Sequence, residues 1–153
     1  MTAITLWGPA TWDLFHTLVY KLKPEHFQKV SYIVFNFITQ ICHNLPCPSC
    51  TNHAKQYLTK VNKNRSFLTD KTLFMNLLYV FHNSVNGRNN KSLFKYEDLS
   101  IYNNKSLIVV FNNFVTYFHS DGNLSLINEN FHRKRLVSTF KQWLTKNINY
   151  FNP

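Results

Sequence analysis

Residues 45–53 read Leu-Pro-Cys-Pro-Ser-Cys-Thr-Asn-His and place two of the chain's three cysteines three positions apart. The prolines on either side of the first cysteine suit the start of a helix, because the first turn makes no use of a proline's missing N–H. Cys47, Cys50 and His53 then recur at i, i+3 and i+6, roughly on one face of that helix. A thiol at a helix N-terminus lies near unpaired amides and the positive end of the dipole, which favour its thiolate.

This spacing predicts a redox-active disulfide between Cys47 and Cys50. A bridge that closes so short a loop removes little entropy from the unfolded chain, so a chemical use is favoured over a structural one. The motif alone leaves two alternatives open: a pair of buried, inert thiols, and a zinc site built from Cys42, Cys47, Cys50 and His53. The zinc site requires Cys42, whereas the disulfide does not.

The composition indicates one folded domain. A chain of 153 residues can bury a core without disulfide or metal staples, and 44% hydrophobic residues predict folding rather than disorder. The formal charge of +10 favours nucleic acid, acidic membrane surfaces or acidic partners. Basic residues are spread from Lys21 to Lys146, with the densest cluster at 132–135, which indicates a solvated surface. A basic nucleic-acid-binding or virion structural protein with incidental cysteines is a further alternative.

The sequence shows no targeting segment. The first residues have neither a basic n-region nor a long apolar h-region, which predicts that there is no signal or transit peptide. The longest apolar runs, such as 107–111, are too short to span a bilayer. Three cysteines are also too few for a secreted disulfide scaffold. We therefore expect a soluble protein without a membrane span.

Few glycines and prolines interrupt the chain, which predicts an all-α fold. A first helix is expected to open at 8–9, with Pro9 near its first position, and to run to about Lys21. A second is expected over 24–42, apolar on more than one side, which suits a central or interface position. The third carries the cysteine pair and ends near Val61, before an exposed loop over 62–66.

Three further elements are predicted in the second half. Asp70 caps a fourth helix with a buried stripe of Leu73, Leu77, Leu78, Phe81 and Val85. Residues 106–119 are expected to be helical, because the segment is longer than a usual strand. After a turn at 121–123, a last helix over 128–147 is predicted with an apolar face of Phe131, Leu136, Phe140, Trp143 and Leu144. The final third holds no cysteine and offers no candidate chemistry.

A second informative stretch, residues 81–94, reads Phe-His-Asn-Ser-Val-Asn-Gly-Arg-Asn-Asn-Lys-Ser-Leu-Phe. His82, Asn83 and Asn86 share one face of the predicted fourth helix. Asparagine is a mediocre helix former, so its concentration beside an apolar stripe favours hydrogen bonds to a planar polar ligand. The alternative is that these residues only fray and cap the helix end.

Three stretches in this order, 7–18, 46–53 and 82–94, resemble the Erv/ALR family of FAD-linked sulfhydryl oxidases. The first reads Trp-Gly-Pro-Ala-Thr-Trp-Asp-Leu-Phe-His-Thr-Leu. The resemblance covers roughly residues 6–99 and implies a four-helix FAD-binding bundle with a short fifth helix over 1–100. Additional C-terminal helices over 101–153 would pack on the same domain. Leu45 stands where the family usually has an aromatic residue, and Ser92 where it usually has proline.

The resemblance also implies roles for individual residues. Cys47 would be attacked by the incoming thiolate, and Cys50 would lie next to the flavin, so these two are the expected catalytic residues. His53 could orient the flavin or tune local charge, and is as readily explained as a structural residue. No metal is expected. The residues expected to bind the cofactor are Trp7, Gly8, Trp12, His16, His53, His82, Asn83, Asn86 and Lys91.

The activity implied by the resemblance is an FAD-dependent thiol oxidase that forms disulfides in a partner dithiol protein. Electrons would pass through Cys47–Cys50 to FAD and then to O2, giving H2O2. Because no second cysteine pair is present, the protein would oxidise its partner directly, as in members from large cytoplasmic DNA viruses. The partner would then be a thioredoxin-like or small viral thiol protein used in virion assembly, in host cytoplasm or virion. No specific nucleic acid is expected.

The family commonly forms homodimers through its first two helices. The broad apolar surface over 32–41 would suit that arrangement, so the resemblance implies a homodimer here as well.

Overall fold

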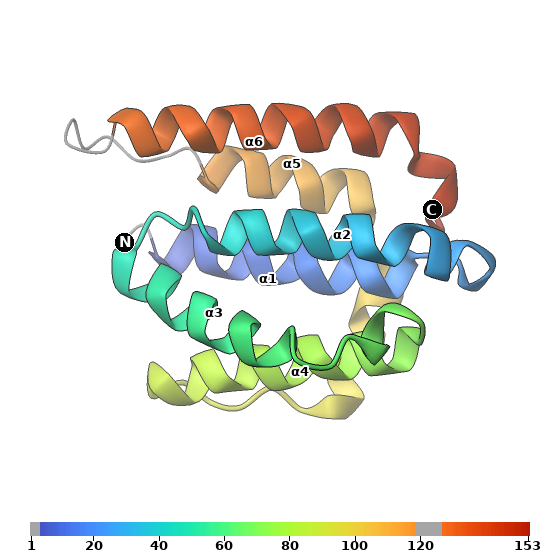
Figure 1. Ribbon diagram of the computed structural model, residues 1–153, viewed down its shortest axis with the longest axis horizontal. Helices are drawn as coiled ribbons and strands as arrows, with labels where there is room; N and C mark the ends of the chain where they lie inside the picture. The colour runs from blue at the N-terminus through green and yellow to red at the C-terminus, as the bar shows by residue number, and fades with distance from the viewer. Residues whose placement is uncertain (1–3, 119–126) are drawn as a thin grey trace.

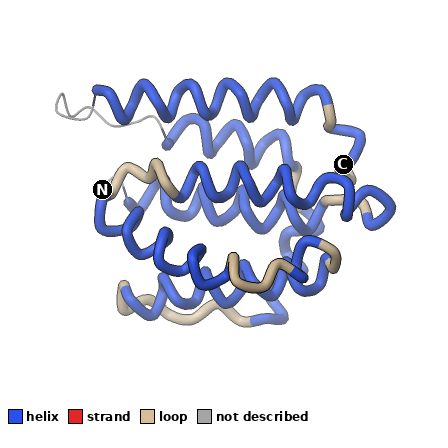
Figure 2. Tube along the Cα trace, in the orientation of Figure 1, coloured by secondary structure: helices blue, strands red, loops and turns tan. Residues whose placement is uncertain are grey.

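The computed structural model describes residues 4–118 and 127–153, and within these ranges the chain contains no strand, so the all-α prediction is confirmed. Figure 2 shows helices joined mostly by short loops. The α-helices are α1 Ile4–Lys21, α2 Phe27–Cys42, α3 Pro48–Val61, α4 Lys71–Arg88, α5 Leu107–Phe118 and α6 Ile127–Lys146. Short 3₁₀ helices are η1 Pro24–His26, η2 Ser66–Leu68, η3 Tyr96–Asn104 and η5 Ile148–Tyr150.

The helices form three layers (Figure 1). α1 and α2 lie in the middle, α3 and α4 cover one side, and α5 and α6 cover the other. α1 contacts α2, α4, α5 and η3, so it is the central element. Leu14 and Leu18 of α1, and Leu22 directly after it, recur at helical spacing and are fully buried, which is the pattern of a helix with an apolar stripe in the core.

The start of α1 corrects the sequence prediction. The helix begins before Gly8, and Pro9 lies inside it rather than at its first position. A proline this close to the N-terminus removes one donor only, and Thr11 Oγ1 donates to the carbonyl of Trp7 at 2.7 Å in the same stretch. The early start matters because it brings the side chain of Trp7 into the core.

The apolar surface of α2 is covered by α6 within the chain. The Phe37 and Phe140 rings stack with their centroids 4.4 Å apart, and Trp143 lies 5.7 Å from Phe37. Of the apolar residues that suggested a dimer face over 32–41, Tyr32 is the exposed one, at 56%. The homodimer therefore stays a prediction, and within the chain α6 packs on this surface at Phe37, while Phe67 and Phe74 pack against Phe35.

The predicted boundaries of the later helices are close to the observed ones, but two apolar stripes are wrong in part. On α4 the buried residues are Phe74, Leu78 and Phe81, whereas Leu73 is 42% exposed. Phe74 lies beside Phe27, Phe35 and Phe67, so the larger aromatic ring takes the core position. The turn predicted at 121–123 lies outside the described residues.

The predicted face of the last helix is wrong at its first position. Phe131 is 60% exposed, and Arg133 is buried in its place, so this arginine leaves the expected solvated cluster at 132–135. Leu136, Phe140 and Leu144 are buried as predicted. In the described ranges, no helix combines the length and the apolar character needed to cross a membrane.

Candidate active site

The cysteine motif forms the start of α3. Cys47 has extended backbone and is the N-cap of the helix, and Pro48 occupies its first turn. Cys47 and Cys50 form a disulfide with their Cα atoms 5.2 Å apart, so the predicted pairing is confirmed. The backbone N–H of Cys50 donates to Sγ of Cys47 at 3.3 Å. An amide of the first turn therefore already points at the sulfur of Cys47, where it would stabilise a thiolate in the fully reduced pair.

The third cysteine, Cys42, is not part of the disulfide. Cys42 is 1% exposed at the end of α2, and burial raises the pKa of its thiol. Over 4–118 and 127–153, no group of three or more histidine, cysteine or acidic side chains is placed to hold a metal ion. The four candidate zinc ligands of the sequence are therefore not brought together as a site.

The disulfide opens onto a cavity of about 480 Å³, within the size range of small-molecule and cofactor sites. α1, α3, α4 and the segment after α4 all contribute to its wall. Most of the exposed wall is apolar, as in such sites generally. Of the predicted site residues, the ones that line it are Trp7, Gly8, Trp12, Cys47, Cys50, His53, His82, Asn86 and Lys91.

Two stacked rings form a flat part of the wall. Trp12 of α1 and His82 of α4 are nearly parallel, at 8°, with centroids 4.3 Å apart. His82 Nδ1 lies 3.0 Å from His16 Nε2, so one imidazole donates to the other. Burial, the neighbouring His82 and Lys105 lower the pKa of His16 to about 3; burial and Lys91 lower that of His82 to about 4. Both rings are therefore neutral at neutral pH.

His16 and Asn83 are predicted site residues that do not line the cavity. His16 is 3% exposed and lies behind His82. Asn83 Nδ2 donates to the carbonyl of Phe94 at 2.9 Å, and its Oδ1 accepts from the N–H of Phe94 at 2.7 Å. The amide of Asn83 is thus used on the backbone of the chain, and both residues support the wall from behind.

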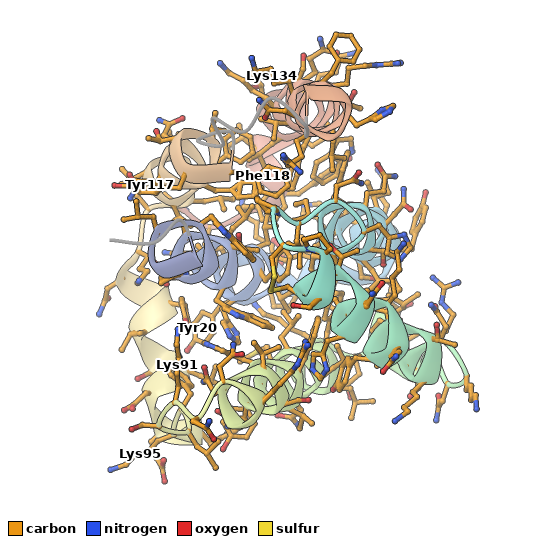
Figure 3. The ribbon with its side chains drawn as sticks, turned by 90° about the vertical axis from the view of Figure 1, so that its left-hand side faces the viewer. Tyr20, Lys91, Lys95, Tyr117, Phe118 and Lys134 are labelled. Carbon is orange, nitrogen blue, oxygen red and sulfur yellow. A yellow bond between two sulfur atoms is a disulfide. The ribbon has the colours of Figure 1, made fainter. Side chains whose placement is uncertain are left out.

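The end of α4 explains how that segment returns to the cavity. Asn90 has a φ of 56°, a left-handed conformation that asparagine tolerates better than most residues. The N–H of Lys91 then bonds back to the carbonyl of Asn86 at 2.8 Å. This reversal carries Lys91 and Phe94 along the cavity. Figure 3 shows Lys91 between α4 and η3.

His53 occupies the next turn of α3 after the disulfide. Its Nε2 lies 3.3 Å from Ser84 Oγ on α4. Burial, with Arg88 and Lys60, lowers the pKa of His53, so its neutral form prevails at neutral pH. Two functional roles were considered for this residue: orienting the flavin and tuning the local charge. A neutral imidazole adds no charge, so it favours the first role, through hydrogen bonding.

Several wall residues were not predicted. Phe81 of α4 lies edge-on to Trp12 of α1 and stacks on Tyr57 of α3. Phe81 therefore links these three helices at the cavity. Phe94 and Arg88 lie within the motif at 81–94, so the motif could have identified them. Ile101 and Tyr102 come from η3 in the final third, where no chemistry was expected, and no sequence pattern marks them.

The arrangement suits a flat aromatic ligand held against a disulfide. The parallel Trp12 and His82 rings offer a planar contact, and the basic side chains of Arg88 and Lys91 lie at the same cavity for anionic groups. The two sulfurs of Cys47 and Cys50 line the cavity and are partly exposed. A ligand there would therefore lie between the rings and the sulfur atoms.

Comparison with known proteins identifies the relatives of this chain. The sequence model of the Erv1 / Alr family matches residues 9–106, more than half of the chain. A protein of Invertebrate iridescent virus 6, 347L, is 34% identical over 94 residues, which is 58% of this chain and 83% of that protein. Its name assigns it provisionally to the FAD-linked sulfhydryl oxidases.

A protein of African swine fever virus named FAD-linked sulfhydryl oxidase is 32% identical over 92 residues, 60% of this chain and 75% of that protein. No solved structure matches the chain significantly. The matched region contains the disulfide, both stacked rings and the Asn83 to Lys91 stretch, and it includes every lining residue of the cavity except Trp7 and Gly8. This chain belongs to the Erv1 / Alr family.

Proposed function

We propose that this protein is an FAD-dependent thiol oxidase that forms disulfides in a partner dithiol protein. The observation that carries the proposal is the Cys47–Cys50 disulfide opening onto a cavity walled by the stacked Trp12 and His82 rings. Relatives named FAD-linked sulfhydryl oxidase share this region. Because these relatives are viral, we place the activity in the host cytoplasm or in the virion, with a thioredoxin-like or small viral thiol protein as the partner.

The residues of the cavity fit FAD. Trp12 and His82 would hold the flat ring system, Asn86 offers an amide for polar ring atoms, and Lys91 offers a cation for the phosphates. Trp7 and Gly8 of α1 close the same wall. When bound, FAD would supply the two-electron acceptor for the dithiol and pass the electrons to O2, giving H2O2.

The chain's own part of the reaction is thiol–disulfide exchange. A substrate thiolate attacks Sγ of Cys47, the bond between the sulfurs breaks, and Cys50 leaves as a thiolate. A second substrate thiol then attacks the mixed disulfide, which releases the substrate disulfide and leaves Cys47 and Cys50 as a reduced pair. The N–H of Cys50 stabilises negative charge on Cys47 at that stage.

The visible absorption spectrum of the purified protein tests this proposal. We expect a flavin spectrum that bleaches when a dithiol is added without oxygen, and that recovers in air. Cys47→Ser should keep the bound flavin and lose the bleaching. A colourless protein that cannot be reconstituted with FAD would contradict the proposal.

Cys42→Ser provides the matched control. The thiol of Cys42 is buried, and its raised pKa keeps it protonated and unreactive. Bleaching should therefore proceed in this variant as in the unmodified protein. If the unmodified protein instead held zinc and Cys42→Ser lost it, the metal site would be indicated.

A further inference from the structure

The stretch of chain that carries the disulfide is strongly basic. Between Glu25 and Glu97 the sequence holds a single acidic residue, Asp70. Asp70 caps α4 at the end opposite Arg88, and a helix of 18 residues is about 27 Å long. The same span holds nine basic residues: Lys29, Lys55, Lys60, Lys63, Arg65, Lys71, Arg88, Lys91 and Lys95.

Three of these side chains, Lys55, Lys60 and Arg88, form what we call the basic rim. Arg88 Nη1 donates to the carbonyl of Ser49 at 3.1 Å, so its guanidinium lies against the first turn of α3, between the two cysteines. Lys55 and Lys60 are exposed on α3, the helix that begins with the disulfide.

The rim extends from the first turn of α3, where Arg88 lies, along the helix to Lys60 in its last turn. Burial and the charge of Lys55 lower the pKa of His43, which precedes the motif. Burial, Arg88 and Lys60 lower the pKa of His53, which follows it. Asp13 is an acidic residue of the cavity wall, and it is paired with Lys105 at 3.0 Å. The rim therefore faces solvent without a neutralising carboxylate in the wall beside it.

The rim remains available when the cavity is filled. Lys55 and Lys60 do not line the cavity, so anionic groups bound inside would leave both charges facing solvent. Pro48 and Ser49, between the two cysteines, are exposed as well. A protein that brings a thiol to Cys47 therefore docks beside Arg88, with Lys55 and Lys60 further along α3.

We propose that the basic rim docks an acidic segment of the substrate, with carboxylates near the substrate cysteine pairing with Lys55, Lys60 and Arg88. This inference rests on the proposed function. In the exchange the substrate dithiol loses two electrons and two protons, and the Cys47–Cys50 disulfide is reduced to two thiols. A nucleic acid would satisfy the charge of the rim but would bring no thiol to the disulfide, so the acidic protein is the favoured occupant.

Two dithiol peptides test the proposal on the flavin-loaded protein. They share one Cys-x-x-Cys segment and differ only in flanks of glutamate or lysine, with dithiothreitol as a small uncharged substrate. We expect kcat/KM for the glutamate peptide to be about tenfold or more higher than for the lysine peptide at low salt. This difference in kcat/KM between the two peptides should disappear as the salt concentration rises to about 0.5 M, because salt screens exposed charges. Versions of both peptides with serine in place of cysteine can bind but cannot react. Fluorescence anisotropy should show that the glutamate version binds the protein more tightly than the lysine version.

Charge-reversing variants locate the effect. Lys55→Glu together with Lys60→Glu should remove most of the preference and leave the dithiothreitol rate unchanged. Lys141→Glu and Lys146→Glu together make the same change of charge at exposed positions near the end of α6 and should keep the preference. Figure 1 shows α6 in the layer on the far side of α1 and α2 from α3.

The outcomes separate this inference from the proposed function. Equal rates and equal binding for both peptides, with dithiothreitol still oxidised, would overturn the docking inference alone. A protein that oxidises no dithiol at all would overturn the function, and the serine peptides would still test docking. If duplex DNA binds through Lys55 and Lys60 while the peptides show no charge preference, the rim is a nucleic-acid site and the inference fails.

Discussion

His16 and His82 form a hydrogen-bonded pair of imidazoles at the cavity wall, and the pKa of each is lowered. They share one hydrogen bond of 3.0 Å between their ring nitrogens. If both imidazoles were protonated to the cationic form, two like charges would be in contact. Tyr102 stacks on the other side of His16 with centroids 4.8 Å apart, and burial raises its pKa, which keeps its hydroxyl neutral. The wall behind Trp12 is therefore built from neutral rings.

This pair predicts that stability is lost in mild acid. Both histidines have a native pKa below the usual 6.5, about 3 for His16 and about 4 for His82. The unfolded chain binds their protons first as pH falls, so unfolding becomes easier from about pH 6.5 down to about pH 4. Each group contributes up to about 1.4 kcal/mol per pH unit in that window. Urea unfolding between pH 7.5 and 4.5 measures the slope.

Two variants separate this effect from general acid destabilisation. His16→Gln keeps a hydrogen-bonding group beside His82 but cannot take up a proton, so its slope should be clearly shallower. Leu18→Ala, at a fully buried position of the same helix, should lower stability at every pH without changing the slope. Parallel curves for His16→Gln and the unmodified protein would contradict the assignment.

At the scale of elements, local chemistry accounts for how α3 and α4 begin. Cys47 caps α3 through its sulfur, and Pro48 fits the first turn. Asp70 Oδ1 accepts from the N–H groups of Thr72 at 2.9 Å and Leu73 at 3.3 Å. These two caps fix where the antiparallel helices start, and Tyr57 stacking on Phe81 holds them together.

Asp70→Ala should destabilise the protein by about 1 kcal/mol, because two amides of the first turn lose their acceptor. Asp70→Ser should retain most of the stability, since a serine hydroxyl can accept from the same amides. The free energy of unfolding in urea measures both. Because Asp70 lies at the end of α4 far from the disulfide, dithiol-dependent bleaching of the flavin should not change. An equal loss for alanine and serine would show that capping is not the cause.

The starts of α3 and α4 could be predicted because proline and aspartate act locally. Periodicity alone gave the wrong phase on α4, since Leu73 and Phe74 are both apolar and only packing against Phe35 and Phe67 decides between them. Pro9 was read as a helix start, but one lost donor did not prevent an earlier start. Local signals therefore predicted the elements better than their faces.

The candidate site divides in the same way. The cysteine pair and the motif at 81–94 could be identified from sequence, because residues of characteristic type lie close together in the chain. Tyr102 and Ile101 could not, since they reach the cavity only through the packing of η3 against α1. Asn83 was assigned to the ligand, and its contact with Phe94, eleven residues later, depends on the chain reversal at Asn90.

At the scale of the whole molecule, the C-terminal helices are packed into the core rather than attached to it. α5 lies along α1, and the buried Arg133 of α6 donates to the carbonyl of Asn44, just before the cysteine motif, at 3.4 Å. Lys21 at the end of α1 donates to the carbonyls of Asn103 and Pro153 at 2.6 and 2.8 Å. The division into a core over 1–100 and an extension over 101–153 stays a prediction, and these contacts favour joint unfolding.

Phe140→Ala tests whether both parts unfold together. Phe140 is 1% exposed on α6 and packs against Phe37 of α2 and Phe111 of α5. Removing its ring should destabilise the protein by about 3 to 5 kcal/mol. If the helices form one cooperative unit, release of the flavin beside α3 and loss of helical circular dichroism should shift to lower temperature together, although the substitution lies in the other layer.

Phe131→Ala is the matched control on the same helix. Phe131 is 60% exposed, so the same change of side chain should alter stability by no more than about 0.5 kcal/mol. If Phe140→Ala instead split the transition in two, with flavin release unchanged while part of the helical signal melted early, α5 and α6 would form a separate folding unit. In that case the covering of α2 by α6 would be a reversible contact, and the surface over 32–41 would again be open to a second copy of the chain.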